Sequence, residues 1–384
     1  MDALQLFDVF DDPRGEDFTV GVEEEFFLVD AETRALRDDA EDVLARAHPP
    51  AGCVIDSELK RSQVESGTAV CRELSQVRAS VVGLRRTLGE AAAATGARLL
   101  ASGTHPFARW DEDGGVTSSA AYLQLHDTYG LLTVEQSVSG CHIHVGIRDP
   151  ELTIAVMNRV RGWIPVLVAL SANSPFWMGH DSRYASFRTE VFHRWPTAGI
   201  PEHFADRAAY DHLVAQLRAT KSIDTPARLY WDVRPSARYP TLEFRAPDVL
   251  MTIDECIATT AIVRALVEIT HRQAEAEVPF EPPRPELLRA ALWRAARFGL
   301  SDHLLDLEQM ELRPAPEVLQ SLLALIRPVL DERGEWEEVA ATLNFVEREG
   351  TGALRQCRAQ TEADGLSAVV DRVATATLAG TTWP

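Results

Sequence analysis

Three consecutive glutamates stand inside a segment that otherwise has the composition of a buried β-strand. Residues 18–29 read FTVGVEEEFFLV, and a polar turn at residues 30–34 closes the segment. Successive side chains of a strand point to opposite faces, so Glu23 and Glu25 share one face about 6–7 Å apart, and Glu24 points to the other. The fold must therefore solvate or compensate two like charges on a half-buried face.

Two interpretations of this strand stay open. Glu23 and Glu25 can simply lie on a solvated face of a sheet. Against this, glutamate is depleted in strands, and the flanking Val, Phe and Leu residues indicate a central strand. A cation would compensate the pair, and hard carboxylate ligands suit Mg²⁺ or Mn²⁺ better than Zn²⁺. The strand therefore favours a site for a divalent cation.

Two further segments carry residues that could join such a site. DSELKRSQVE places Glu58 and Glu65 seven positions apart, a pair that is common on charged surfaces as well. GCHIHVG places His142 and His144 on one strand face, with Cys141 and its apolar neighbours on the other. Such histidines can ligate a metal or serve as hydrogen-bonded structural groups. Neither pattern decides between the two.

Two later segments combine acidic and basic residues at period two. Asp232 and Arg234 share a strand face in WDVR, and Glu243 and Arg245 share one in TLEFR. These residues can form cross-strand salt bridges. Alternatively, Glu243 can bind a cation while the arginines hold phosphate or a carboxylate through their planar forks. Both interpretations stay open from these residues alone.

The first two thirds of the chain are predicted to mix strands and helices, and the last third to be helical. Strands are predicted at 18–29, 97–103, 133–147, 228–234 and 240–246, and helices at 73–96, 151–170, 252–272, 316–331, 335–348 and 365–379. Thr252 and Glu255 form a capping-box pattern. We expect one α+β domain over residues 1–384, sheet-rich at 1–250 and helical at 251–384, with helices packed over a mostly antiparallel sheet.

Charge balance and missing motifs exclude several classes of protein. Asp and Glu number 58 against 38 Lys and Arg, a net charge of −20, so we expect no general binding of nucleic acid or anionic membrane. GxxxxGK[ST], a GxGxxG that follows a strand, and GxSxG are absent from the sequence. Five scattered cysteines, no secretory signal and no long apolar run predict a cytoplasmic protein with reduced thiols.

Nine motifs follow one another along the chain: GVEEEFFLVD, ELKRSQVE, SGTHPF, SGCHIHVGI, ALSANSPFW, YASFR, RWPTAG, WDVRPS and TLEFRAPD. With these motifs the chain resembles the glutamate–cysteine ligase type 2 family of bacterial carboxylate–amine ligases. The resemblance implies a fold related to glutamine synthetase, with an antiparallel sheet curved into a funnel and helices outside. It also implies that ATP binds with two or three Mg²⁺ ions around its phosphates, Mn²⁺ being an alternative metal.

The resemblance also implies roles for particular residues. The implied metal ligands are Glu23, Glu25, Glu58, Glu65, His142 and Glu243. Arg245 and His142 are implied to contact the nucleotide, and Arg188, Arg234 and Arg245 to contact substrate or phosphate. His144 is not in the implied metal set.

The implied reaction joins a carboxylate to an amine in two steps. The carboxylate of glutamate attacks the γ-phosphorus of ATP to give an acyl phosphate, and the amine of cysteine or another compound then displaces phosphate. Such chemistry requires positioning and charge stabilisation more than a covalent nucleophile. Cys141, on the opposite strand face from His142, is accordingly predicted to be a small core residue. A homodimer of this enzyme is expected at the level of the family.

Three other functions remain as alternatives. A zinc-dependent hydrolase could use His142 and His144 with a third ligand. A kinase-like phosphotransferase on a related fold would leave a stable phosphorylated product. A nucleotide-binding protein without catalysis is the third, and it is disfavoured because every acidic position of the family motif is filled.

Overall fold

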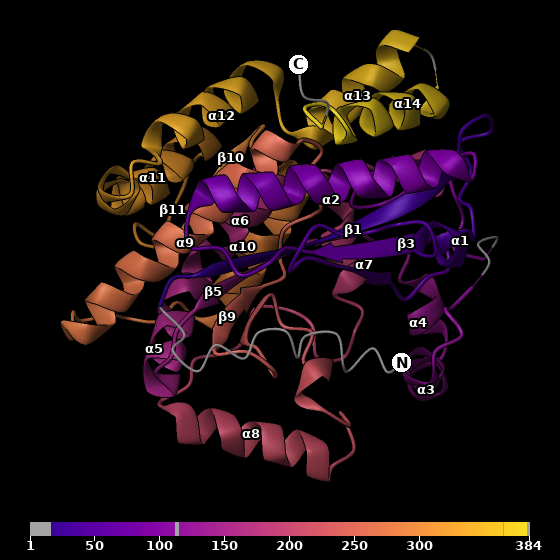
Figure 1. Cartoon of the computed structure of the whole chain (residues 1–384). Coiled ribbons are helices and arrows are strands. Elements are labelled where there is room, and N and C mark those ends of the chain that lie inside the picture. Colours follow the sequence, from indigo (N-terminus) through magenta and orange to yellow (C-terminus); the bar gives the residue numbers. More distant parts are fainter. Residues whose placement is uncertain (1–16, 112–114, 364, 382–384) are drawn as a thin grey trace.

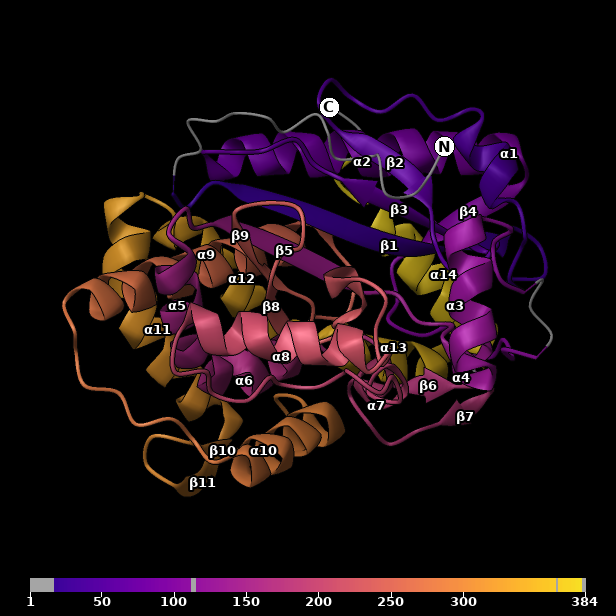
Figure 2. The same cartoon turned by 90° about the horizontal axis from the view of Figure 1, so that it is seen from below.

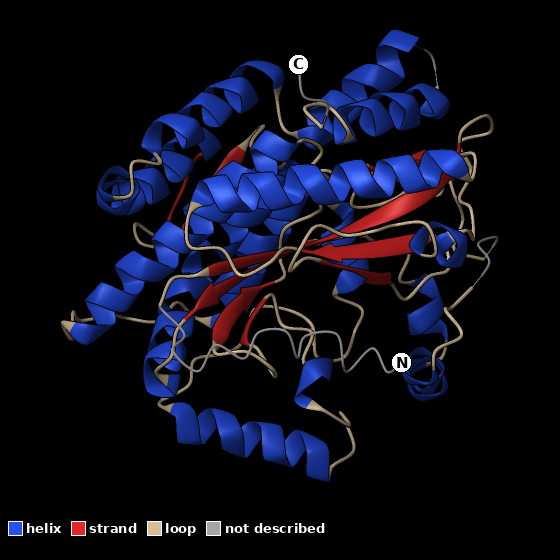
Figure 3. Cartoon of the chain, in the orientation of Figure 1, coloured by secondary structure: helices blue, strands red, loops and turns tan. Residues whose placement is uncertain are grey.

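The computed structural model describes residues 17–111, 115–363 and 365–381. Seven strands form one sheet in which every pair of neighbours is antiparallel (Figure 3). Its strands are β1 (Val20–Asp30), β2 (Val54–Ser57), β3 (Gln63–Gly67), β4 (Ala97–Leu100), β5 (Cys141–Gly146), β8 (Val233–Pro235) and β9 (Thr241–Phe244). The order is β2-β3-β1-β5-β9-β8, with β4 also paired to β1. The long strand β1 is therefore central, as its apolar flanks predicted.

Helices occupy most of the remaining chain. They are α1 (Ala40–Leu44), α2 (Leu74–Ala94), α3 (Ala120–Tyr129), α4 (Leu131–Glu135), α5 (Pro150–Val160), α6 (Ile164–Ser171), α7 (Phe187–Phe192), α8 (Arg207–Ala219), α9 (Ile253–Glu275), α10 (Pro285–Phe298), α11 (Ala315–Glu332), α12 (Trp336–Glu349), α13 (Gly352–Ala363) and α14 (Leu366–Thr377). Two 3₁₀ turns are η2 (Arg161–Trp163) and η3 (Pro226–Arg228), and two small hairpins are β6 (Phe176–Trp177) with β7 (His180–Asp181) and β10 (His303–Asp306) with β11 (Glu311–Pro314).

The two faces of the sheet have different neighbours. Helices α2, α9 and α14 pack against β1, β4 and β5 on one face. The apolar residues of that face join α9 in the main core, as Val22, Ile143 and Phe244 show. On the other side of the sheet lie α3, α4 and α8, with α8 set well away from the strands (Figures 1 and 2). The side chains that alternate with the core residues therefore face the less densely covered side.

Several sequence predictions about local structure are confirmed. Thr252 caps α9: its hydroxyl accepts the Glu255 amide at 3.3 Å, and the Glu255 carboxylate accepts the Thr252 amide at 3.1 Å. The apolar stripe of α2 is buried at the predicted positions, which are Leu74, Val77, Val81, Leu84 and Leu88. These features depend on residues close in sequence, which is why local patterns predicted them.

Other boundaries were wrong. The strand predicted at 133–147 begins only at Cys141, because residues 131–135 form α4. The strand predicted at 228–234 is displaced to Val233–Pro235, after the 3₁₀ turn η3. The helix predicted at 151–170 is divided by η2 into α5 and α6. Helices α3, α8 and α13 and the β10–β11 hairpin within the helical third were not predicted.

One helical run, Pro150–Ser171, passes a test of length and composition for crossing a membrane. In the fold, 72% of its most apolar window is buried inside the protein. Ile154, Val156 and Leu167 of this run all belong to the main hydrophobic core. The run therefore packs as a core helix.

Candidate active site

The antiparallel register brings charged residues from five strands into one row on the less covered face of the sheet. The partners directly opposite one another are Glu65 and Glu25, Glu23 and His142, His144 and Glu243, and Glu243 and Arg234. Opposite residues on one face have Cβ atoms about 4.5–5.5 Å apart. The row therefore gathers residues that are up to 220 positions apart in sequence (Glu23 to Glu243).

The two histidines lie among the glutamates of β1. His142 places Nδ1 3.2 Å from Glu23 and Nε2 3.5 Å from Glu25. His144 places Nε2 3.4 Å from Glu23, and its Nδ1 lies 3.0 Å from the Thr241 hydroxyl. The Nε2 atoms of both rings are buried and make no hydrogen bond within the described part of the chain. Two orphaned ring nitrogens at carboxylates are an arrangement that a bound cation would satisfy.

The end of the row at β2 and β3 holds two carboxylates, Glu58 and Glu65, that form no ion pair with a basic side chain in the described part of the chain. Glu58 follows β2 and accepts a hydrogen bond from the Tyr122 hydroxyl at 3.4 Å. Burial, and then the charge of Glu25, raise the pKa of Glu58 to about 8. Burial, and then the charges of Glu23, Glu58 and Glu25, raise the pKa of Glu65 well above its usual range. This end of the row is therefore electrostatically unsatisfied.

The pKa shifts reverse toward the middle and the other end. Burial opposes ionisation of Glu23, but His144 and His142 hold the pKa of Glu23 well below its usual range. Burial likewise opposes ionisation of Glu243, but Arg234 and Arg245 hold its pKa well below the usual range. The row thus runs from an acidic end at β2 and β3 to a cationic end at β8 and β9.

Three sets of side chains converge closely enough to hold a metal ion. In each set the ligand atoms lie within 4.8 Å of one another: Glu23, Glu65 and His142; Glu23, His144 and Glu243; and Glu25, Glu58 and Glu65. The donor set is mainly carboxylate oxygen, which suits Mg²⁺ or Mn²⁺. All six residues that the sequence analysis named as metal ligands lie in these sets. His144, which it left out, lies there too.

The three predicted arginines occupy different positions. Arg245 donates to Glu243 at 2.5 Å, and its Nε is buried without a partner among the described residues. Arg234 grips Glu243 with two bonds of 2.8 and 3.1 Å and donates to the carbonyls of Ala227 and Leu229. Arg245 therefore has a donor to spare on the row, while the donors of Arg234 are nearly all used.

Arg188 lies behind the row. It is buried and donates to the carbonyls of Arg245 and Ala246 at 3.1 and 3.2 Å. Its guanidinium packs so closely against Gly140 that a Cβ there would approach to 2.2 Å. The Gly140 amide in turn donates to Glu25 at 2.5 Å. A direct substrate contact for Arg188 stays a prediction: its terminal nitrogens are directed at the backbone that shapes the site, and its Nε is buried without a partner among the described residues.

Comparison with known proteins decides the family. The model of glutamate–cysteine ligase family 2 matches residues 19–372. The chain belongs to this family. A Frankia alni protein that carries the provisional name glutamate–cysteine ligase 2-2 is 42% identical over 369 residues, covering 92% of this chain and 96% of that protein. A Rhodopirellula baltica protein with the provisional name glutamate–cysteine ligase 2 is 39% identical over 345 residues, covering 88% and 92%.

Solved structures agree on the fold of this glutamate–cysteine ligase family 2 member. The glutamate–cysteine ligase of Francisella tularensis, solved in complex with AMP, superposes with a TM-score of 0.67 at 12% identity, covering 96% of this chain and 91% of that one. The bifunctional glutathione synthetase of Pasteurella multocida gives 0.66 at 18% identity, covering 95% and 53%. These likenesses confirm the predicted glutamine-synthetase-like α+β fold.

The alternative functions find no support in this family member. A zinc site built on His142 and His144 would take its other ligands from a mainly carboxylate set, which suits Mg²⁺ or Mn²⁺ better than Zn²⁺. The two relatives and two solved structures described above are named as ligases or as a synthetase. The ligase interpretation of the row therefore stands.

Two residues near the row were missed by sequence reasoning. Tyr122, on α3, reaches Glu58 from a helix that no strong apolar periodicity marked. Gly140 supplies a backbone amide to Glu25, and its only sequence signal was its place before CHIHVG in a family motif. Both act through tertiary contacts between distant segments, which a local pattern does not contain.

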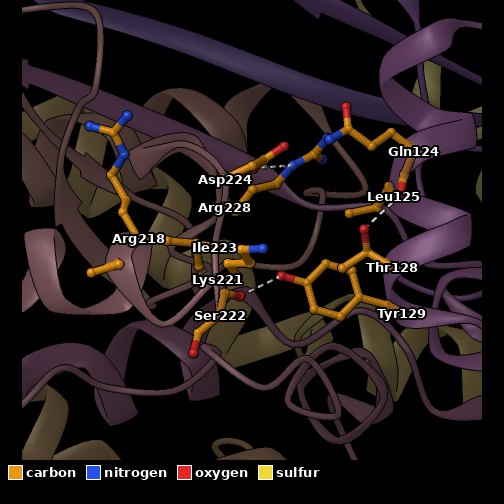
Figure 4. Close-up of a pocket in the computed structure, with 11 residues that line it drawn as sticks. Gln124, Leu125, Thr128, Tyr129, Arg218, Lys221, Ser222, Ile223, Asp224 and Arg228 are labelled. Atoms are coloured by element: carbon orange, nitrogen blue, oxygen red, sulfur yellow. Dashed lines mark hydrogen bonds and ion pairs between the residues drawn. The ribbon is translucent and has the colours of Figure 1, made fainter.

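A separate cavity of about 530 Å³ lies between α3 and the loop after α8 (Figure 4). Arg218, Lys221 and Arg228 contribute positive charge to its lining. Arg228 donates to the Ala121 carbonyl at 3.2 Å, and the carbonyls on either side of Arg228 accept from Arg234. The cavity is thus linked to the carboxylate row only through the backbone next to Arg228, and no carboxylate of the row lines it.

Proposed function

We propose that this ATP-dependent carboxylate–amine ligase requires Mg²⁺ and forms the γ-glutamyl amide of cysteine or of another small amine. The observation that carries the proposal is the single row of five carboxylates, Glu23, Glu25, Glu58, Glu65 and Glu243, with arginines at one end only. A polyanion and a substrate carboxylate can meet there only if cations neutralise the acidic end. Membership of the family supplies the reaction class.

The three converging sets are where we place the metal ions. Glu25, Glu58 and Glu65 would form one site, and Glu23 would lie between two others that include His142 and His144. Mg²⁺ bound there, with Mn²⁺ as the alternative, would neutralise phosphate charge while ATP supplies the phosphoryl group. The raised pKa values of Glu58 and Glu65 support a cation at this end, because a nearby cation restores the ionised form.

The arginine end would orient the anionic groups. Arg245 keeps an unused donor on the row, so we assign it the direct contact with phosphate or with the substrate carboxylate. Arg234 holds Glu243 in a fixed orientation and serves as a positioning residue. Arg188 positions the strand behind both through the Arg245 carbonyl. Preorganised charge of this kind is the main contribution of a protein to phosphoryl transfer.

The finer assignments belong to the same proposal. Glutamate as the acid and cysteine as the amine follow from the names of the relatives, and activity of the class EC 6.3.2.2 would follow from them. A cytoplasmic location and one catalytic domain over the chain agree with reduced cysteines and with a family match over residues 19–372. A homodimer remains a proposal at the level of the family.

A screen of ADP release over amino acids and amines, followed by mass spectrometry of the product, tests the function. We expect ADP release that depends on both an acid and an amine, together with a product that has lost water relative to the two substrates. A stable phosphorylated product would establish the phosphotransferase alternative instead. Full activity in a metal-stripped sample with chelator would contradict the Mg²⁺ requirement.

A further inference from the structure

A histidine–aspartate pair lies beside the arginine end of the row. His193 follows α7 directly, and its Nε2 lies 2.9 Å from Oδ1 of Asp232, the residue before β8. The Asp232 side chain is 3% exposed, and that of His193 is 24% exposed. Neither residue has a role in the metal sets or in the arginine contacts described above. The pair is therefore a titratable histidine and a buried carboxylate to which no function has yet been assigned.

Strand register places this pair on the same face as the row. Arg234 lies opposite Glu243, and two positions away along the two strands the Arg245 amide donates to the Asp232 carbonyl at 2.8 Å. Asp232 and Arg234 are two residues apart, so their side chains share a face. Asp232 thus extends the row next to Arg245, and His193 contacts it from the end of α7.

The hydrogen bond fixes the protonation pattern of the ring. A carboxylate only accepts, so Nε2 of His193 carries the hydrogen that is donated to Asp232. The neutral ring then has its lone pair on Nδ1, which makes no hydrogen bond within the described ranges and belongs to a quarter-exposed side chain. This is the arrangement of a base oriented by a buried carboxylate.

The charged groups around the ring favour its protonated form. Asp232 and Glu190 face it as anions, and Arg188 faces it as a cation. Burial opposes protonation, but Asp232 and then Glu190 raise the pKa of His193 above its usual value. Oδ2 of Asp232 is buried and has no hydrogen-bond partner among the described residues, so its charge acts on the ring without being shared.

Amide formation requires such a base. An amine at neutral pH is mostly an ammonium ion, which has no lone pair for attack on an acyl carbon. The residues assigned so far are metal ligands, arginines and their supports, and none of them can accept a proton from an ammonium group while retaining its assigned task. The proposed reaction therefore lacks a proton acceptor at its second step.

We propose that His193 is the general base that deprotonates the acceptor amine, with Asp232 as the residue that positions it; the proposal rests on the proposed ligase function. Nδ1 takes one proton from the ammonium group. The freed lone pair forms the C–N bond, and the acyl C–O bond to phosphate breaks with its electron pair on phosphate. The departing phosphate accepts the second nitrogen proton, which leaves a neutral amide and an imidazolium that returns its proton to solvent.

The test compares two acceptors in the His193→Gln variant, with ATP, Mg²⁺ and glutamate. The amino group of cysteine is protonated at neutral pH, whereas hydroxylamine is largely uncharged and needs no base. We expect amide formation with cysteine to fall about a hundredfold or more, the usual contribution of a general base. Hydroxamate formation with hydroxylamine should change little. Asp232→Asn should show the same selectivity with a smaller loss, because the ring remains but loses its orienting charge.

Two controls separate this role from a structural one. His212→Gln, at an exposed histidine of α8, should leave both acceptors unaffected. In the wild type, the rate with cysteine should follow ionisation of a histidine whose pKa lies above the usual value, and His193→Gln should shift that dependence toward the pKa of the amine itself. Thermal melting would confirm that each variant is folded.

The possible outcomes are distinct. Equal losses with cysteine and hydroxylamine would make the pair a structural link between α7 and β8 and overturn the proposal, as would full activity of His193→Gln with cysteine. If the wild type released ADP but formed neither amide nor hydroxamate, the ligase function itself would fall, and the base with it. A selective loss with cysteine alone supports the assignment.

Discussion

Adjacent glutamates of β1 meet opposite environments on the two faces of the sheet. On the covered face, Glu24 forms a two-pronged ion pair with Arg85, at 2.5 and 3.1 Å, and both side chains are almost completely buried. On the other face, Glu23 and Glu25 share two histidines with further glutamates. On the covered face, which we call the closed face, the protein itself supplies the counter-charge of the glutamate. On the other face, the open face, the glutamates are available to bind a ligand.

The remaining donors of Arg85 show how complete the closure is. They reach the carbonyls of Leu250, Met251 and Thr377 at 2.8–3.3 Å, and so connect β1 to segments before α9 and at the end of α14. The comparison teaches that a buried carboxylate indicates a site only when the fold does not supply its counter-charge. The type of residue alone does not distinguish the two cases.

The largest expected effect is on the face of the sheet that the helices cover. There, Arg85→Met would leave the buried carboxylate of Glu24 without a counter-charge. Removing one partner of a buried ion pair costs about 3–5 kcal/mol in the free energy of unfolding. Urea denaturation would measure this loss. The double variant Arg85→Met with Glu24→Leu should recover most of the stability, because no buried charge is left unpaired. An unchanged midpoint in the single variant would show that the pair contributes nothing.

On the open face, Glu23→Gln and Glu25→Gln should each lower turnover at least about a hundredfold, roughly 3 kcal/mol of transition-state stabilisation. Stability should fall less than in Arg85→Met, because glutamine keeps a side-chain oxygen that can accept from the histidines or from the Gly140 amide. Steady-state kinetics and denaturation of the same samples would separate the two effects. Glu24→Gln is the matched neighbour: it should lose stability while the folded enzyme keeps its turnover. A loss of turnover in Glu24→Gln as large as in Glu23→Gln and Glu25→Gln would contradict the difference between the two faces.

Metal binding should be linked to pH through the acidic end of the row. Cation binding needs Glu58 and Glu65 ionised, and in the free protein the pKa of Glu58 is raised to about 8 and that of Glu65 also lies well above its usual range. Below these values each retained proton must leave, so Mg²⁺ affinity should rise about tenfold per pH unit per proton released. Calorimetry in buffers of different ionisation heat would count the protons. In Glu58→Gln, Mg²⁺ affinity should rise less steeply with pH. An unchanged dependence would exclude Glu58 as a metal ligand.

The smallest effect sharpens the division among the arginines. Arg245→Lys keeps the positive charge but loses the planar fork, so turnover should fall about tenfold, the equivalent of one charged hydrogen bond. The same change at Arg234 should mainly lower stability, since its donors serve Glu243 and two backbone carbonyls. Kinetics and thermal melting on both variants would test this. A loss of turnover in Arg234→Lys and of stability in Arg245→Lys would instead make Arg234 the ligand contact and Arg245 the positioning residue.

Local sequence patterns predicted the parts of the molecule that depend on nearby residues. The period of two in β1 separated Glu24 from its neighbours, and the capping box of Thr252 set the start of α9. The same reasoning extended β5 backward to residue 133, because Thr133 and Val134 are β-favouring types, although they lie in the helix α4. Strand propensity gave way there to tertiary context.

The sequence by itself determined that β1 has an acidic face and an apolar face, since the direction of a strand side chain follows from its position alone. It also determined the family through its ordered motifs. Only the tertiary structure decided which charges are matched. Antiparallel register brought Glu65 to Glu25 and His142 to Glu23, and the end of α7 brought His193 to Asp232. Whether a buried charge is structural or available for a ligand depends on partners distant in sequence, which no local pattern specifies.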